Sequence, residues 1–505
     1  MKKRRRIYSL SVMILAAWTV LYSQELSLYS EKILRVEGRV HKIILKDCNS
    51  DGLKDIIALH SLSKFPDPAI DRFLSIFIQN NGRFSDLPSQ TLRMDQDEIV
   101  FDIADIDDDP YLELLFLRRD GIYFRKHTTG GYDQTLHPFL FTPSVFLSPD
   151  PSKLTRYEFI CDIDGDALPE ILIPQPDRLL VYSKNTFGEY SLCKSLWNAP
   201  KTSMDAQDQF TLSLHLPILH VHDFNGDAVP DLLLTHDDRL DVYLQHSKEE
   251  QVQQTVLTPP NLIYRFGSRD VNPSPLEPIA PSSIFMEPRD LNADGFVDIV
   301  LSKASRASFT KNISQIQIYI NKAGRFGILP DQIITTENFG GEHIIQDLNG
   351  DGLLDLGLLT FKIGFTQAFR FLITKKAGNS IDFYLMRSDG TYPSTPDCKI
   401  SFTRRVKIGD LLGTAFSQNF HGDFNGDGLN DLFVGTDTHE ISIFLRSPDR
   451  LYWKKRILKI GATVSMHMEI DDLNGDGVSD ILFLYPDTQS PYNRIVLIQS
   501  LGVKR

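Results

Sequence analysis

The segment Asp472-Leu-Asn-Gly-Asp-Gly-Val-Ser-Asp480-Ile-Leu-Phe-Leu484 decides the fold. Oxygen-bearing side chains stand at positions one, three, five and nine of this acidic stretch, and an apolar run follows at once. The same pattern, Asp-x-[Asp/Asn]-x-Asp-x-x-x-[Asp/Glu] and then Ile or Leu, begins at Asp47, Asp105, Asp162, Asp223, Asp290, Asp347, Asp423 and Asp472. The starts are 49 to 76 residues apart. Such near-regular recurrence indicates a repeat protein whose unit carries this loop.

The residue types of the loop favour a hard cation. Carboxylate and amide oxygens recur at every second residue, position seven can offer its carbonyl, and position nine closes the set. Calcium takes six to eight oxygen ligands in flexible loops, whereas magnesium requires stricter geometry and zinc prefers nitrogen and sulfur. We therefore predict several Ca²⁺ ions, up to eight. The predicted ligands are Asp47, Asn49, Asp51, Asp55, Asp105, Asp107, Asp109, Glu113, Asp162, Asp164, Asp166, Glu170, Asp223, Asn225, Asp227, Asp231, Asp290, Asn292, Asp294, Asp298, Asp347, Asn349, Asp351, Asp355, Asp423, Asn425, Asp427, Asp431, Asp472, Asn474, Asp476 and Asp480.

Position six separates the copies. Five copies carry Gly there, which suits a sharp turn with positive φ. Ala167 and Ala228 replace it in the third and fourth copies, and Pro110 fixes a negative φ in the second. The second loop is thus the least suited to a metal, the third is intermediate, and some loops could be Asx-turns without an ion. Closure at position nine, directly before a strand, also distinguishes the loop from an EF-hand.

Between the loops, the same order of apolar runs returns, as in His41–Lys46 before a loop and Leu240–Gln245 after one. Period-two patterning with β-branched and aromatic residues predicts strands. We name the strands of a unit A to D, with the loop between A and B. Four antiparallel strands repeated radially predict an all-β β-propeller of eight blades, or seven if the second unit is no blade. The segment Leu26–Val36 can supply the last strand D, and an insertion is expected at about Lys362–Ser380.

The N-terminus predicts export. Residues 1–24 read as a signal peptide, with Lys2 to Arg6 before the apolar run Ile7–Tyr22, and residues 25–505 as the propeller. An uncleaved anchor is the alternative, and the predicted locations are secreted, periplasmic or cell-surface. The ligand positions hold 26 of the 66 acidic residues, so the net charge of −13 needs no basic partner, and nothing indicates nucleic acid. Four cysteines allow one or two disulfides.

The loops and the Phe-Gly pairs, such as Phe187-Gly188, Phe326-Gly327 and Phe339-Gly340, resemble the FG-GAP/VCBS repeat family. This is the repeat of the integrin α-chain β-propeller and of many exported bacterial proteins. The resemblance covers roughly residues 26–505. It implies that the calcium loops lie on one face and stabilise the fold, and that ligands bind the opposite face.

Three functions follow as hypotheses. The first is a non-enzymatic module that binds a protein or a glycan. Its candidate ligand loops are Ser61–Asp71, Ser302–Ser314, Lys362–Ser380 and Tyr485–Asn493. Trp197, Tyr264 and Phe266 could add contact area, or could pack between blades. The second is a carbohydrate-active enzyme resembling a polysaccharide lyase, for which His215, His220 and His222 form a local cluster. The third is a structural component of an envelope assembly.

Overall fold

The computed structural model describes residues 29–62, 71–95, 97–98, 100–145, 155–156, 158–185, 187–198, 201–205, 211–237, 239–245, 254–266, 283–308, 311–337, 339–361, 373–405, 418–447, 451–486 and 493–502. The chain divides into two compact units. The first unit is Met1–Asp95, Phe369–Gly378 and Phe402–Arg505, and the second is Gln96–Ala368 and Asn379–Ser401. Within the described residues, the strands form eight sheets of four or five strands and two sheets of two.

Each of the eight larger sheets is a blade of a β-propeller, which confirms the predicted fold class. The acidic loop joins strands A and B, and the apolar run after it becomes strand B. In β3 (Asp55–Ser61), for example, every residue is buried. β3 is buried throughout because strands A and C flank it within the sheet and apolar side chains cover its faces. The repeat that carries the loop at Asp105 also forms a blade, so the alternative of seven blades is excluded.

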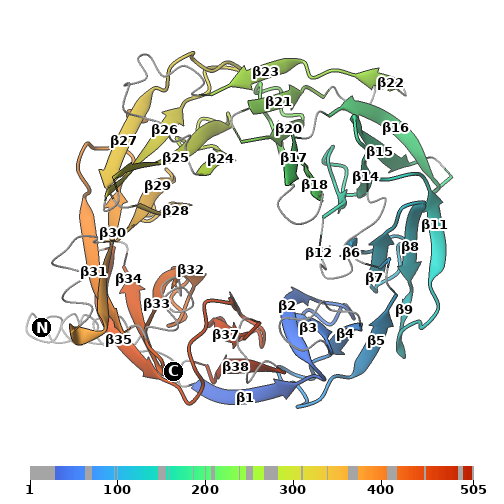
Figure 1. The fold of residues 1–505 in the computed structure, drawn as a ribbon, viewed down its shortest axis with the longest axis horizontal. Helices are drawn as coiled ribbons and strands as arrows, with labels where there is room; N and C mark the ends of the chain where they lie inside the picture. The colour runs from blue at the N-terminus through green and yellow to red at the C-terminus, as the bar shows by residue number, and fades with distance from the viewer. Residues whose placement is uncertain are drawn as a thin grey trace, which may run out of the picture. The chain divides into compact units, whose positions relative to one another are not determined.

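The first unit contains three blades. Their strands, in the order A to D, are β2 (Arg39–Lys46), β3, β4 (Arg72–Phe77) and β5 (Gln90–Met94); β32 (Gln418–Gly422), β33 (Asp431–Asp437), β34 (Glu440–Arg446) and β35 (Tyr452–Lys459); and β36 (Met468–Asp471), β37 (Asp480–Phe483), β38 (Arg494–Ser500) and β1 (Tyr29–Arg35). β1 pairs antiparallel with β38 from Tyr29↔Ser500 to Arg35↔Arg494, and Figure 1 shows the two side by side in blue and red. The N-terminal strand therefore completes the last blade, as predicted.

The second unit contains the other five blades, apart from the ends of β30 and β31. Their strands are β6 (Val100–Ala104), β7 (Glu113–Leu117), β8 (Gly121–Arg125) and β11 (His137–Phe141); β13 (Ile160–Cys161), β14 (Glu170–Pro174), β15 (Arg178–Lys184) and β16 (Tyr190–Trp197); β19 (Ile218–His222), β20 (Asp231–Thr235), β21 (Arg239–Tyr243) and β23 (Leu262–Arg265); β24 (Ser283–Arg289), β25 (Asp298–Ser308), β26 (Lys311–Tyr319) and β27 (Gln332–Glu337); and β28 (Phe339–Gln346), β29 (Asp355–Phe361), β30 (Lys376–Tyr384) and β31 (Cys398–Arg405).

Additional strands extend these blades beyond the repeat. β12 (Thr155–Arg156) pairs parallel with β6, and β22 (Gln254–Thr258) pairs parallel with β16. β9 (His127–Thr128) pairs with β10 (Gly131–Tyr132), and β17 (Lys201–Asp205) with β18 (Thr211–His215). The four-strand pattern does not predict these pieces: β9, β10 and β22 lie between strands C and D of their blades, and β12, β17 and β18 lie between one blade and the next.

One predicted ligand loop is wrong. Ser302–Ser314 is not irregular, because β25 and β26 continue through it to the pair Ser308↔Lys311. Of the other three loops, residues 63–70, 362–372 and 487–492 lie outside the described residues. The insertion expected at about 362–380 lies between β29 and β30.

Aromatic residues fill the space between blades of the second unit. Phe266 is 3% exposed, and its ring centroid lies 4.6 Å from that of Tyr319 and 6.1 Å from that of Tyr264. Phe224, from the loop of the fourth blade, joins the same cluster. The packing alternative is therefore confirmed for Tyr264 and Phe266.

The export prediction falls on residues 1–24, which lie outside the described residues. No helix in the described ranges has the length and apolarity needed to cross a membrane. The thiols of Cys161, Cys193 and Cys398 are free, and Cys48 is buried in the first loop.

Candidate metal centres

The first carboxylate of each loop organises the turn. In seven loops, all but the second, its Oδ2 accepts the backbone amide of position six at 2.7–3.0 Å. In six loops, its Oδ1 accepts the amide of position four at 2.6–2.8 Å. These bonds draw the chain around the carboxylate. In five loops Oδ1 also accepts the amide of position three or position five, so both of its acceptor sites are filled.

Positions three and five form the opposite wall of the loop. In all eight loops, Oδ1 of position five accepts the backbone amide of position seven at 2.7–2.9 Å. In the six loops with Asn at position three, its Nδ2 donates to Oδ2 of position five at 2.9–3.1 Å. The Oδ1 of the same Asn accepts the backbone amide of position five at 3.0–3.2 Å. Hydrogen bonds thus hold the sequence-predicted ligands at positions three and five side by side in each of these six loops.

The carboxylate at position nine is buried and joins the loop to its blade. Each one accepts the backbone amide of position two at 2.9–3.3 Å. Burial raises the pKa of Asp355 to about 6, of Asp298 to about 7 and of Asp431 to about 8. A bound cation would lower these pKa values again and keep the carboxylates ionised.

A second hydrogen bond connects this carboxylate to strand C. In the six loops closed by Asp, Oδ1 accepts the backbone amide of a residue at or just after the end of strand C, at 2.6–2.9 Å. In the second loop the closing residue is Glu113, and its Oε1 is buried with no hydrogen-bond partner among the described residues. Glu has one methylene more than Asp, so its carboxylate reaches further into the loop.

Two positions of the loop adopt positive φ, and the sequence analysis identified only one. Position six does so in seven loops, including Ala167 at 67° and Ala228 at 65°. Position four does so as well, with Ser50 at 56°, Asp108 at 62° and Ala293 at 57° where Gly is absent. The strain expected for the two Ala residues at position six is therefore present.

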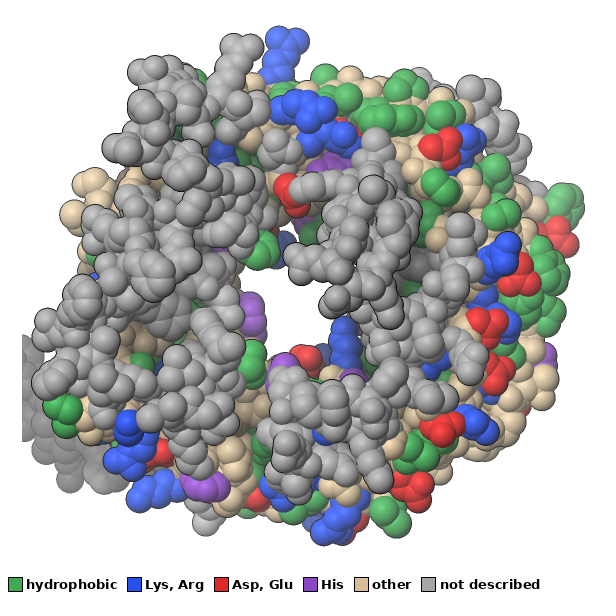
Figure 2. Space-filling view, viewed as in Figure 1, with side chains coloured by type: hydrophobic (Ala, Val, Ile, Leu, Met, Phe, Trp, Pro, Cys, Tyr) green, Lys and Arg blue, Asp and Glu red, His purple; other side chains and the backbone are tan. Residues whose placement is uncertain are grey.

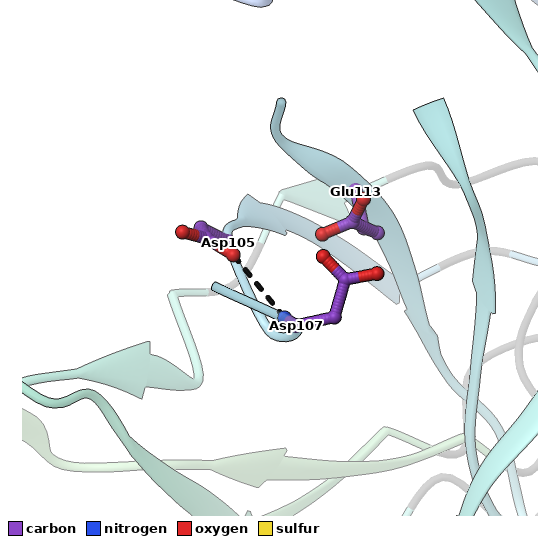
Figure 3. Close-up of side chains that lie close together, drawn as sticks. All are labelled: Asp105, Asp107 and Glu113. Atoms are coloured by element: carbon purple, nitrogen blue, oxygen red, sulfur yellow. Dashed lines mark hydrogen bonds between the residues drawn. The ribbon is translucent and has the colours of Figure 1, made fainter. Parts of the chain in front are cut away.

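The second and third loops bring three acidic side chains closest together. Ligand oxygens of Asp105, Asp107 and Glu113 lie within 4.8 Å of one another, and so do those of the set Asp162, Asp164 and Glu170. In Figure 3 the carboxylates of Asp107 and Glu113 face each other, and the backbone amide of Asp107 donates to Asp105. Both loops have Asp at position three and Glu at position nine, which is why carboxylates alone complete these groups.

Side-chain amides connect neighbouring loops, and the sequence analysis missed them. Gln79, Gln245 and Asn321, which we call the amide latches, each follow the end of strand C by two residues. The Nδ2 of Asn321 donates to the carbonyl of Val297 in its own loop at 3.2 Å and to that of Phe224 in the preceding loop at 2.9 Å. Gln245 and Gln79 make the equivalent pairs at 2.6–2.8 Å. The only sequence signal is an amide residue at this register in three repeats.

Two of the three histidines weighed for catalysis, His220 and His222, lie on β19, the first strand of the fourth blade. The rings of His220 and His222 stack with centroids 6.4 Å apart, as their alternation on one strand predicts. The pKa of His220 is lowered to about 4, mainly by burial and to a smaller extent by the neighbouring His222 and Arg289. His215 belongs to β18, and its side chain lies outside the described set. A neutral imidazole and a guanidinium thus lie near each other in the second unit.

Charged side chains of both signs are mixed on the surface. On the face drawn in Figure 2, the described Lys and Arg side chains are interspersed with Asp and Glu. Among the described residues, ion pairs include Arg93–Asp71 at 2.8 Å and Lys399–Asp382 at 2.7 Å. A nucleic-acid surface would instead concentrate basic residues on one face.

Comparisons with known proteins locate the repeat. A family model described as an FG-GAP-like repeat matches residues 290–358 and 423–483, which contain the last four acidic loops. No curated protein matches the chain. Among solved structures, the chain is similar to the crystal structure of the V. cholerae biofilm matrix protein Bap1, with 13% identity, coverage of 95% of this chain and 92% of that chain, and a TM-score of 0.34.

Proposed function

We propose that this β-propeller, two stretches of which match an FG-GAP-like repeat, is exported, is stabilised by calcium and binds a protein or a glycan. The recurrent loop carries the proposal. In each copy, backbone amides of the loop hold the carboxylates of positions one, five and nine, and in the second and third copies three carboxylates lie within 4.8 Å of one another. Such an all-oxygen set in a flexible loop suits Ca²⁺.

The residues fit a calcium ion chemically. In each loop that takes an ion, the side-chain oxygens of the predicted ligands, with the carbonyl of position seven, would hold it. The ion would neutralise carboxylates that burial otherwise makes costly to ionise. It would therefore fix each A–B loop and, through position nine, the end of strand C.

A ligand surface is expected at the other end of the blades. In an antiparallel blade the A–B loop and the B–C connection lie at opposite ends of the sheet. At the B–C end of the second unit, Arg239 lies 5.5 Å from the ring centroid of Trp197 and forms an ion pair with Asp241 at 2.9 Å. Aromatic and arginine side chains of this kind often dominate recognition.

The binding proposal is tested with an array of defined glycans and immobilised protein ligands, in calcium-containing buffer. We expect saturable binding that Trp197→Ala weakens by at least tenfold, while the melting temperature in calcium stays within 2 °C of wild type. Unchanged binding by the Trp197 variant would show that the ligand surface does not include this side chain. Absence of binding across both arrays would favour the architectural role in an envelope assembly.

An enzyme remains the second candidate because of the histidine group in the second unit. A lyase needs a base and a cation beside the uronate. His220 is neutral at pH 7 and lies near Arg289, whose Nε donates to Glu287 at 3.0 Å. Incubation with pectic polysaccharides would release unsaturated sugars, seen as absorbance near 235 nm, if this candidate is right. His220→Ala would abolish that signal.

A further inference from the structure

The second loop contains a cation of its own. The Nζ of Lys126 contacts Oδ2 of Asp107 and lies 3.2 Å from Oδ2 of Asp109, the carboxylates at positions three and five. Both are side chains that would otherwise be available to a metal ion. The Lys126 side chain is 39% exposed, so it reaches the loop from its solvent side.

Lys126 is peculiar to this repeat. Arg125 pairs with Leu114, the first residue of strand B after position nine, and Lys126 is the next residue. The residues at the same register in the other blades are all uncharged: Ile78, Ser183, Leu244, Ile320, Leu385, Leu445 and Gln499. The ammonium therefore coincides with the one loop that departs most from the pattern.

A second lysine neutralises the same loop. The Nζ of Lys184 lies 2.7 Å from Oδ1 of Asp108 at position four, and the Lys184 side chain is 7% exposed. Lys184 follows the strand pair Ile171↔Tyr182 by two residues, which is the register of the amide latches. It thus reaches into the preceding loop, as Gln245 and Asn321 do. Together the two ammonium groups supply the same charge as one divalent ion.

The loop has also lost what the metal-type loops share. Pro110 has no amide hydrogen, so the bond from position six to Asp105 is missing. Asp105 keeps only the bonds to Oδ1, from the amides of Asp107 at 3.2 Å and Asp108 at 2.8 Å. The turn is held by these bonds and by the two lysines.

We propose that the ammonium of Lys126, together with that of Lys184, takes the place of the metal ion in the second loop, which is therefore closed without calcium. This inference rests on the proposed function, because it contrasts the second loop with loops that bind Ca²⁺. It also makes the junction of the second and third blades resistant to chelators, because the lysines are covalently part of the chain.

The test is the number of calcium ions per chain, measured by mass spectrometry after gel filtration in calcium buffer. Three variants are compared with the wild type. Asp109→Asn removes position five of the second loop, Asp476→Asn removes position five of the eighth loop, and Lys126→Met removes the ammonium while keeping its alkyl packing. We expect no change for Asp109→Asn, one ion fewer for Asp476→Asn and one ion more for Lys126→Met.

The outcomes separate the two proposals. Loss of an ion in Asp109→Asn, or no gain in Lys126→Met, would overturn the replacement of metal by lysine. An unchanged count in Asp476→Asn would instead contradict the calcium proposal at a standard loop. Circular dichroism of each variant in calcium verifies that the fold is retained, since Asp109 and Lys126 are partly exposed.

Discussion

Asn321→Ala tests the amide latches, because this side chain makes four hydrogen bonds inside the second unit. Its Nδ2 donates to the carbonyls of Phe224 and Val297, and its Oδ1 accepts the amides of Gly324 and Arg325 at 2.8 and 2.9 Å. Asn321 is 1% exposed, so water cannot replace these bonds freely.

The expected loss in free energy of unfolding follows from these four hydrogen bonds. Each intramolecular hydrogen bond contributes about 1 kcal/mol net, and a buried acceptor left without a donor costs about 1–3 kcal/mol. The two amides of the following turn lie near solvent, so the main loss comes from the two carbonyls. The expected destabilisation is about 3–4 kcal/mol. With an unfolding entropy of roughly 2 cal/mol/K per residue, a cooperative chain of 505 residues would lose about 3 °C in melting temperature.

Urea denaturation and differential scanning calorimetry, both in calcium buffer, measure this loss. The matched control is Gln315→Ala on β26 of the same blade, whose side chain is exposed. The control is expected to stay within about 0.5 kcal/mol of wild type. If Asn321→Ala costs no more than Gln315→Ala, the latch does not stabilise the pair of loops, and the reasoning is wrong.

Two further predictions concern local energetics. His60 is 1% exposed, and its ring nitrogens form hydrogen bonds with the carbonyl of Glu37 and the hydroxyl of Ser75. Burial lowers the pKa of this imidazole to about 4. In the unfolded chain the same imidazole has its ordinary pKa of about 6.5, so it is protonated at a higher pH than in the folded chain. The free energy of unfolding should therefore fall by about 3 kcal/mol as the pH drops from about 6.5 to about 4, and stay constant below that. His60→Asn should remove that slope in urea titrations, and an unchanged slope would refute the assignment. Ala228→Gly should raise stability by about 0.5–1 kcal/mol, because it relieves a positive φ of 65°. The reciprocal Gly295→Ala should cost a similar amount, since no atom lies within 4 Å of a Cβ built there, and a loss of stability in Ala228→Gly would contradict the strain argument.

The sequence predicts the blades well because the loop and the following strand are local. The carboxylate spacing and the apolar run of Asp480 to Phe483 fix where strand B begins, and the spare N-terminal segment predicts β1. The hairpin turn at Asn81-Gly82 is confirmed by positive φ at both residues. Each of these signals lies within about ten residues of the feature it predicts.

Contacts between repeats could not be predicted in this way. Asn321 reaches Phe224 across 97 positions of the chain, and Lys184 reaches Asp108 across 76. Their partners are defined only when neighbouring blades pack. The positive φ at Ala293 is likewise hidden, because a non-Gly residue there gives no local sign of a left-handed backbone. Additional strands such as β22 depend on an open edge of a sheet that already exists.

The most direct test of calcium stabilisation is thermal unfolding of the purified protein with calcium and with excess EGTA, alongside the metal count. Binding to the folded state alone stabilises by about 2.7 kcal/mol per site when free calcium is a hundredfold above Kd. Seven such loops would raise the melting temperature by roughly 18 °C in a chain of 505 residues that unfolds as one unit. The account predicts a chelator-induced drop of this order and about seven ions per chain. An identical melting temperature in EGTA, with no bound metal, would contradict it.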